Sequence, residues 1–178
     1  MHHSDNSTIG IRRLTRIGEN EIEQLADVLV DCVEGGASVS FMQPFSRDKA
    51  MAFWRRVADD VGKGARVVLV AEDASGIIGT VQLVLDLPEN QPHRADVAKM
   101  LVHRRARYRG VAEKLMRALD DSAREAGRTL LVLDTVTGSI AERLYTRLGW
   151  QRVGVIPDFA LWPAGGFCAT TFFYRRLA

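Results

Sequence analysis

Four arginines lie within six residues of this sequence, and a glycine follows them directly. They belong to the segment RRARYRGVAEKL, residues 104–115, in which Gly110 precedes a helical pattern of apolar residues. The first amides of a helix have no partner inside it, and the helix dipole adds positive potential, so such an end binds anions. Glycine allows close approach to the backbone, and arginine supplies fork-shaped donors. The segment therefore predicts a pyrophosphate-binding turn, with a solvated basic loop as the alternative.

Other chemistry-bearing motifs are absent from the sequence. There is no G-x-x-x-x-G-K-[ST] and no G-x-G-x-x-G, which excludes a Walker A loop and the dinucleotide fingerprint. The segment TGSIA lacks the G-x-S-x-G elbow of serine hydrolases. Cys32 and Cys168 have no His or Cys neighbour at metal-ligand spacing. We therefore expect no metal site, and two reduced thiols in a cytoplasmic protein.

The overall composition is that of a globular domain. The chain has 178 residues, a net charge of +2 and 47% hydrophobic residues. We expect a polar tail over residues 1–8 and a single domain over 9–178. No apolar run approaches the length of a membrane span, so no membrane partner is expected. The small net charge and the lack of interleaved aromatic residues argue against nucleic acid as the partner of the arginines.

The periodicity of apolar residues predicts an α/β fold. Helices separate the later strands, so some neighbouring strands there should be parallel. The run over 95–103 is apolar on both faces except at Asp96 and Lys99, which is typical of a strand in the middle of a covered sheet. The expected strands are 9–15, 65–73, 77–87, 95–103, 129–135, the first part of 150–159, and 169–177, and the expected helices are 20–34, 47–61, 111–126 and 139–149.

Side chains that could cap helices mark several of these boundaries. Asn20 with Glu23 has the spacing of a capping box, and Ser46 precedes the second helix. Ser139 with Glu142 forms a second S-x-x-E capping box. The segment ALWPAGGF, residues 160–167, reads as a loop, and residues 157–166 are expected to contribute to substrate selectivity.

Two motifs together resemble those of a known enzyme family. Residues 107–112, RYRGVA, match the R/Q-x-x-G-x-G/A signature of the GCN5-related N-acetyltransferases (GNAT), in a strand–loop–helix context. Residues 141–150, AERLYTRLGW, match the family's A-x-x-x-Y-x-x-x-G-[FW] pattern. The segments GGASVSFM, RADVAKMLV and LDTVTGSIAE also resemble stretches of the tabtoxin-resistance acetyltransferases.

This resemblance implies a GNAT fold and acetyl-CoA as cofactor. The fold would have a mixed central sheet of six to seven strands, helices on both faces, and a splayed parallel pair (95–103 and 129–135) forming the cleft. The first of these strands would hold the pantetheine arm at Met100, Leu101 and Val102, with the Met100 amide on the thioester carbonyl. The remaining cofactor contacts would be Arg107, Tyr108, Arg109, Gly110, Val111, Ala112, Thr135, Ser139 and Ala141.

The resemblance also assigns roles to three proton-transfer groups. Tyr145 matches the tyrosine that protonates the leaving thiolate, with a merely buried tyrosine as the alternative. Asp96 and Asp134 are equal candidates for the base that deprotonates the amine, directly or through water. Burial against apolar segments would make either carboxylate a stronger base, but each could instead be paired with an arginine or a helix end.

One position departs from the family pattern. Many members have Asn three residues before the alanine of the second motif, where this sequence has Gly138. One usual cofactor contact is therefore missing, and Ser139 either replaces it or serves as a helix cap. Arg104 and Arg105 either reach outer phosphates or are solvated.

The acceptor is expected to be a small-molecule primary amine, such as an amino-acid-like toxin or antibiotic, with a role in resistance to it. Phe41, Met42, Phe159 and Trp162 could wall an apolar pocket, and Asp31, Glu34 or Asp158 could hold a cationic amine. A protein N-terminus or lysine is an alternative acceptor, and a non-catalytic acetyl-CoA sensor is another reading. The family resemblance also implies a homodimer, to which the aromatic segment 170–174 could contribute.

Overall fold

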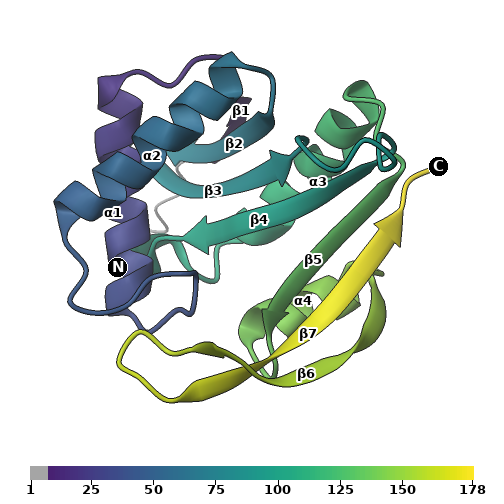
Figure 1. The fold of residues 1–178 in the computed structure, drawn as a ribbon. Coiled ribbons are helices and arrows are strands. Elements are labelled where there is room, and N and C mark those ends of the chain that lie inside the picture. Colours follow the sequence, from purple (N-terminus) through teal and green to yellow (C-terminus); the bar gives the residue numbers. More distant parts are fainter. Residues whose placement is uncertain (1–7) are drawn as a thin grey trace, which may run out of the picture.

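The computed structural model describes residues 8–178 and contains one seven-stranded sheet (Figure 1). Apart from Thr8, the tail predicted for residues 1–8 lies outside the described residues. The strands are β1 (Gly10–Arg13), β2 (Arg66–Asp73), β3 (Gly76–Val84), β4 (Arg94–Val102), β5 (Leu130–Val136), β6 (Gln151–Leu161) and β7 (Phe167–Arg176). The helices are α1 (Glu19–Glu34), α2 (Arg47–Gly62), α3 (Val111–Glu125) and α4 (Ile140–Arg147), with a 3-10 turn, η1 (Arg104–Ala106), before α3.

The strand order explains where a cleft can form. The order is β1-β2-β3-β4-β5-β7-β6, and every neighbouring pair is antiparallel except β4 and β5. The predicted α/β fold with a mixed sheet and one parallel pair is therefore confirmed. The single parallel pair joins an N-terminal group of four strands to a C-terminal group of three.

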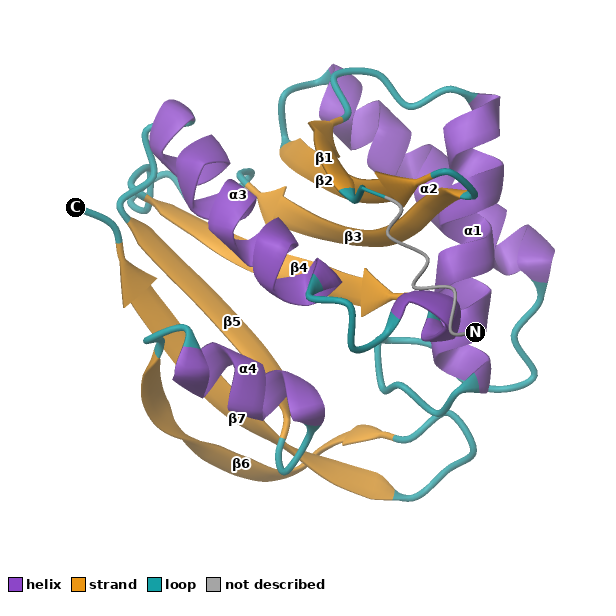
Figure 2. Ribbon diagram, turned by 180° about the vertical axis from the view of Figure 1, so that it is seen from behind, coloured by secondary structure: helices purple, strands orange, loops and turns teal. Residues whose placement is uncertain are grey.

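Two helices cover each face of the sheet. α1 and α2 lie on the face that is toward the viewer in Figure 1, and α3 and α4 lie on the other face, which Figure 2 shows. Each face has its own apolar core. Trp54, Leu25 and Val70 are fully buried under α1 and α2, whereas Leu115 and Phe173 are fully buried under α3 and α4.

The ends of the helices confirm two predicted caps and correct a third. Ser46 accepts a hydrogen bond from the Lys49 amide at 3.1 Å, and Ser139 accepts one from the Glu142 amide at 3.1 Å. The capping box predicted for Asn20 and Glu23 is wrong by two residues, because α1 begins at Glu19. The Glu21 carboxylate instead accepts a hydrogen bond from the Gly18 amide at 3.0 Å.

The C-terminal hairpin differs from the sequence-based expectation. Residues 157–161 continue β6 past a register shift between Ile156 and Ala160, although Ala160 and Leu161 were predicted as loop. Asp158 in this irregular stretch has a positive φ of 51°. β7 pairs with β5 on one side and β6 on the other, so its backbone is not available to pair with a second copy. A dimer through 170–174 therefore cannot form by strand addition, and a contact through the aromatic side chains of this segment stays a prediction.

Gly79 on β3 controls how closely α3 approaches the sheet. A Cβ at Gly79 would lie 2.9 Å from Val111 Cγ1 and 3.1 Å from the Leu101 carbonyl oxygen. We expect Gly79→Ala to lower the free energy of unfolding by about 1–3 kcal/mol through overpacking. Gly62→Ala at the end of α2, where a Cβ meets nothing within 4 Å, should be neutral or stabilising. Urea denaturation checks both, and equal stability of the two variants would contradict the close packing.

Candidate active site

The parallel strands β4 and β5 separate after a short paired segment. Arg94, Ala95 and Asp96 pair with Leu130, Leu131 and Val132, and no pairing continues beyond them. Residues 97–102 of β4 therefore have no strand partner on the side of β5. Figure 1 shows the two strands diverging from this point. Free backbone groups along one edge can bind an extended ligand as an added strand would.

A β-bulge in β4 accompanies the separation. Leu101 pairs with Thr80 and Ala98 with Gln82, so Lys99 and Met100 together stand opposite the single residue Val81. Lys99 has a positive φ of 52°, which a side-chain-bearing residue seldom adopts. A bulge bends its strand and increases the local twist, and here it turns β4 away from β5.

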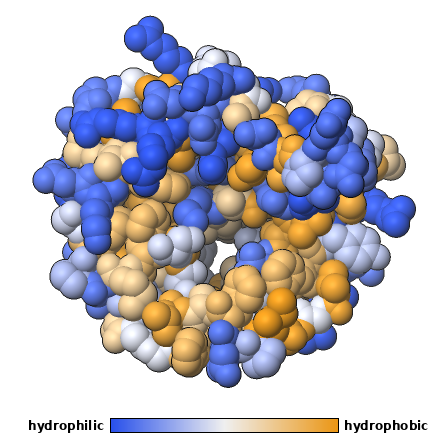
Figure 3. Space-filling view, in the orientation of Figure 1, coloured by the Kyte–Doolittle hydropathy of each residue, from blue (hydrophilic) through white to orange (hydrophobic). Residues whose placement is uncertain are grey.

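Two loops close the wide end of the gap between β4 and β5. The hydroxyl of Ser38, between α1 and α2, donates to the Leu161 carbonyl at 2.9 Å and accepts from Cys168 Sγ at 3.6 Å. The Gln43 amide donates to the Pro163 carbonyl at 2.9 Å. Figure 3 shows a hollow in the middle of the molecule, at the position where β4 and β5 diverge in Figure 1. The hollow is thus enclosed within the plane of the sheet and open toward its two faces.

Unpartnered amides at the start of α3 lie next to this hollow. Gly110, with a φ of 74°, precedes the helix, and a Cβ there would meet nothing within 4 Å. Among residues 8–178, the amides of Gly110, Val111, Ala112 and Glu113 have no hydrogen-bond acceptor. A 15-residue helix therefore begins with free donors, as an anion site requires.

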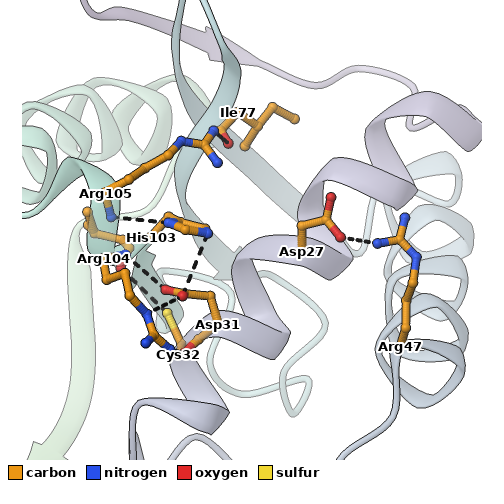
Figure 4. Close-up of polar contacts among 9 residues, drawn as sticks. Asp27, Asp31, Cys32, Arg47, Ile77, His103, Arg104 and Arg105 are labelled. Atoms are coloured by element: carbon orange, nitrogen blue, oxygen red, sulfur yellow. Dashed lines mark hydrogen bonds and ion pairs between the residues drawn. The ribbon is translucent and has the colours of Figure 1, made fainter.

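The neighbouring arginine side chains mainly hold this loop in place. Arg104 forms an ion pair with Asp31 on α1, and its amide donates to the same carboxylate at 2.8 Å (Figure 4). Arg105 Nη2 donates to the carbonyl of Ile77 on β3 at 3.1 Å. The expectation that Arg104 or Arg105 reaches outer phosphates is not supported, because both bind the protein. The predicted role of Asp31 in holding a cationic amine is unsupported for the same reason.

Arg109 and Arg107 also face protein groups. Arg109 Nη1 lies 2.9 Å from the Asp73 carboxylate, whose pKa is lowered to about 2 by hydrogen bonds from Ser75 first and by Arg109 second. The Arg107 guanidinium lies near Cys32 and opposes the effect of burial, which raises the pKa of that thiol to about 11. Backbone amides, rather than guanidinium groups, are thus the donors left available for a ligand.

Tyr145 lies on α4 with its ring in the core. The ring packs against Trp150 and Phe173 at centroid distances of 5.9 and 6.0 Å. Within the described part of the chain its hydroxyl has no hydrogen-bond partner. Burial raises the pKa of Tyr145 well above its ordinary value, and the negative charge of Asp134 raises it further. The phenol therefore remains protonated at neutral pH and can donate a proton.

The two candidate bases lie in different surroundings. Asp134 is exposed near the end of β5, beyond the paired segment, and accepts a hydrogen bond from Thr170 at 2.6 Å. Asp96 lies within the paired segment and forms an ion pair with Arg94. Neither carboxylate is enclosed by apolar side chains as the sequence suggested, but only Asp134 lies beyond the segment in which β4 and β5 are paired.

The other predicted cofactor residues surround the start of α4 and the edge of β4. Ser139 caps α4, and its hydroxyl also lies 3.4 Å from that of Thr135. Three half-buried residues pack against the core under α3 and α4: Ala141, Met100 and Val102. The side chain of Leu101, between Met100 and Val102, is buried in the other core, under α1 and α2. The bulge sets this alternation of side chains along β4.

The predicted acceptor residues form two separate aromatic groups. Phe41 packs against Phe45 and Phe53 at centroid distances of 4.7 and 5.3 Å. Phe159 packs edge-on against Phe172 at 5.8 Å. Met42 and Trp162 are partly exposed on the two loops that close the gap. No ring contact joins the two groups within residues 8–178.

No group of three or more His, Cys, Asp and Glu side chains among the described residues is placed to hold a metal ion. None of their helices is both long enough and apolar enough to cross a membrane.

The chain is similar to acetyltransferases in sequence and structure. Residues 64–152, half of the chain, match the Acetyltransferase (GNAT) domain family. An uncharacterized N-acetyltransferase in the hisH-hisA intergenic region of Azospirillum brasilense is 27% identical over 163 residues, covering 89% of this chain and 95% of that protein.

Solved structures of this kind share the fold. An N-acetyltransferase from Staphylococcus aureus Mu50 superposes with a TM-score of 0.79 at 16% identity, covering 97% of this chain and 100% of that one. The putative acetyltransferase yncA of Salmonella typhimurium, solved with acetyl-CoA, superposes with a TM-score of 0.77 at 19% identity, covering 96% and 94%. The chain belongs to the GNAT acetyltransferase family, whose members use acetyl-CoA. A specific closeness to the tabtoxin-resistance acetyltransferases is not established.

Asp31 is expected to be the main anchor of the loop before α3. Its side chain is only 10% exposed and binds both the amide and the guanidinium of Arg104. We expect Asp31→Ala to lower the free energy of unfolding by about 1–3 kcal/mol, because the amide and guanidinium of Arg104 would lose their hydrogen-bond acceptor. The same variant should bind acetyl-CoA more weakly. Asp27→Ala, one turn earlier, breaks only an exposed pair with Arg47 and should cost about 1 kcal/mol or less.

Urea denaturation and calorimetric titration of acetyl-CoA measure the two effects. Figure 4 shows the two aspartates pointing to different partners from the same helix. An Asp31→Ala variant with unchanged stability and cofactor affinity would show that the loop holds its shape without this contact.

Proposed function

We propose that the protein transfers the acetyl group of acetyl-CoA to the primary amine of a small molecule by direct attack. The observation that carries this proposal is the enclosed hollow between β4 and β5. The ties from Ser38 and Gln43 to the β6–β7 hairpin bound it at its wide end. A bounded opening suits a small acceptor, whereas an extended peptide would need an open groove.

The two faces of the sheet would bind the two substrates. The amides at the start of α3 would take the pyrophosphate, and the free edge of β4 would pair with the pantetheine arm. Thr135, Ser139 and Ala141 would line the same channel near the start of α4. The Met100 amide would stabilise the negative charge that develops on the thioester oxygen.

Proton transfer would be divided between the same two faces. Leu131 and Leu133 on β5 point into the core beneath α3 and α4, so Asp134, the next residue after Leu133, points in the alternation to the face of α1 and α2. Asp134 would take a proton from the incoming ammonium. The amine nitrogen then forms a bond to the acetyl carbon and loses its second proton to solvent, the carbon–sulfur bond breaks, and Tyr145 protonates the departing thiolate from the other face.

Two other functions compete with this one. Acetylation of a protein N-terminus or lysine would require the closing loops to admit a chain. A non-catalytic acetyl-CoA sensor would bind the cofactor but would release no thiol with any amine. A placement in the cytoplasm and a role in resistance to an antibiotic or toxin remain part of the proposal, and acetylation of an amine-bearing toxin would support the latter.

Replacing the phenol tests the proposed acid. We expect Tyr145→Phe to lower kcat by no more than about 10²-fold, the low end for general acid catalysis, because a thiolate is already a stable leaving group. The KM for acetyl-CoA should change little. Tyr174→Phe on β7 serves as the matched control and should retain full activity. Thiol release from acetyl-CoA measures the rates, and an unchanged kcat in Tyr145→Phe would remove the phenol from the mechanism.

Replacing each carboxylate tests the proposed base. We expect Asp134→Asn to lower kcat/KM by about 10²–10⁴-fold, the range for a general base. Asp96→Asn should leave turnover nearly intact, because Asp96 is engaged by Arg94 in the paired segment. Steady-state rates with one amine decide between them. The reverse order of effects would assign the base to Asp96.

A further inference from the structure

Lys99 is a charged side chain at the opening that the proposed mechanism does not use. It lies in the β4 bulge, where the strand turns away from β5. Its ammonium donates a hydrogen bond to the Ser40 hydroxyl at 3.1 Å, and among residues 8–178 it forms no ion pair with a carboxylate. The other three lysines, Lys49, Lys63 and Lys114, are exposed. A half-buried ammonium without a counter-ion is costly unless a ligand completes its surroundings.

Aromatic rings hold Lys99 on the α1 and α2 side of the opening. Its Nζ lies 6.0 Å from the ring centroid of Phe41 and 5.8 Å from that of Phe53. Burial lowers the pKa of Lys99, the positive charge of Arg66 lowers it further, and Asp134 opposes both. The side chain is therefore fixed in a partly apolar setting in which a single anionic group would be strongly attracted.

Asp134 supplies the opposite charge on the neighbouring strand. Its carboxylate acts on the ammonium of Lys99 and on the phenol of Tyr145, so it lies within electrostatic reach of both. Asp134 and Lys99 nevertheless form no ion pair, which places their charged atoms more than 4.0 Å apart. The face of α1 and α2 thus presents a cation and a carboxylate on opposite sides of the gap, and neither forms an ion pair among residues 8–178.

We propose that Lys99 binds an anionic group of the acceptor and that the acceptor is a zwitterion, such as an amino acid with a free carboxylate. The amine of the acceptor faces Asp134 and the carbonyl of the acetyl group, while its carboxylate forms an ion pair with Lys99. Phe41 and Phe53 line the position of an apolar side chain. This inference rests on the proposed function, since it names the class of amine acetylated at the same site.

Pairs of acceptors that differ only in the carboxylate test the inference. Leucine would be compared with 3-methylbutylamine, and phenylalanine with 2-phenylethylamine, in the wild type and in Lys99→Met, Lys99→Gln and Lys49→Met. Met and Gln also carry a Cβ at the same positive φ, so the backbone strain at position 99 is unchanged. Thermal denaturation verifies that each variant is folded, and Lys49→Met controls for the loss of one positive charge.

The expected result is a selective loss of the carboxylate-bearing acceptor. The wild type should favour each amino acid over its amine, and Lys99→Met and Lys99→Gln should lower kcat/KM for the amino acid by about 10–100-fold, as expected for a lost charge-assisted hydrogen bond. Their rates with the amines, and all rates of Lys49→Met, should remain within about twofold. Equal losses for amino acids and amines, or no loss, would overturn the inference while leaving N-acetylation intact.

A binding measurement separates this inference from the proposed function. If no amine releases thiol, the proposed function fails, and calorimetric titration of leucine into the protein saturated with coenzyme A then decides the role of Lys99. Binding to the wild type that is weakened about tenfold or more in Lys99→Gln supports an anion site. Absence of binding, or equal binding to both, overturns it.

Discussion

The whole site depends on the separation of two parallel strands that are paired over only three residues each. A sheet normally satisfies its backbone groups by pairing, and an interior strand with an unpaired stretch exposes donors and acceptors that need another partner. The bulge at Lys99 and Met100 creates this exception by adding one residue to β4 relative to β3. The two groups of strands stay joined at Asp96 and Val132, so the opening is rigid at one end.

In the arginine-rich loop, residues 104–109, the charged side chains hold the loop in its shape. Asp31 and Asp73 neutralise Arg104 and Arg109, and the carbonyl of Ile77 binds Arg105. These contacts fix the turn against α1 and the β2–β3 hairpin, and they leave the amides after Gly110 directed outward. A binding site made of backbone amides needs such contacts from neighbouring side chains, because its amides must remain without a hydrogen-bond acceptor until the ligand binds.

The two faces of the sheet have different chemical characters at the opening. Tyr145 lies on the face of α3 and α4, in a core that keeps its phenol protonated. Lys99 and Asp134 lie on the face of α1 and α2, where they are partly accessible and of opposite charge. Under the proposed mechanism, this division separates protonation of the leaving group from deprotonation of the attacking amine across the thickness of one sheet.

The sequence by itself determined the α/β class, most of the strands and helices, the caps at Ser46 and Ser139, and the turn at Gly110. These features depend on local periodicity and on residues close together in the chain. Only the tertiary structure decided what distant side chains contact: that Arg104 binds Asp31, that Asp96 is engaged by Arg94 while Asp134 lies beyond the paired segment, and that residues 157–161 extend β6. Lys99 looked like an ordinary polar position in an apolar strand, because a bulge arises from pairing with β3 and no local pattern encodes that register.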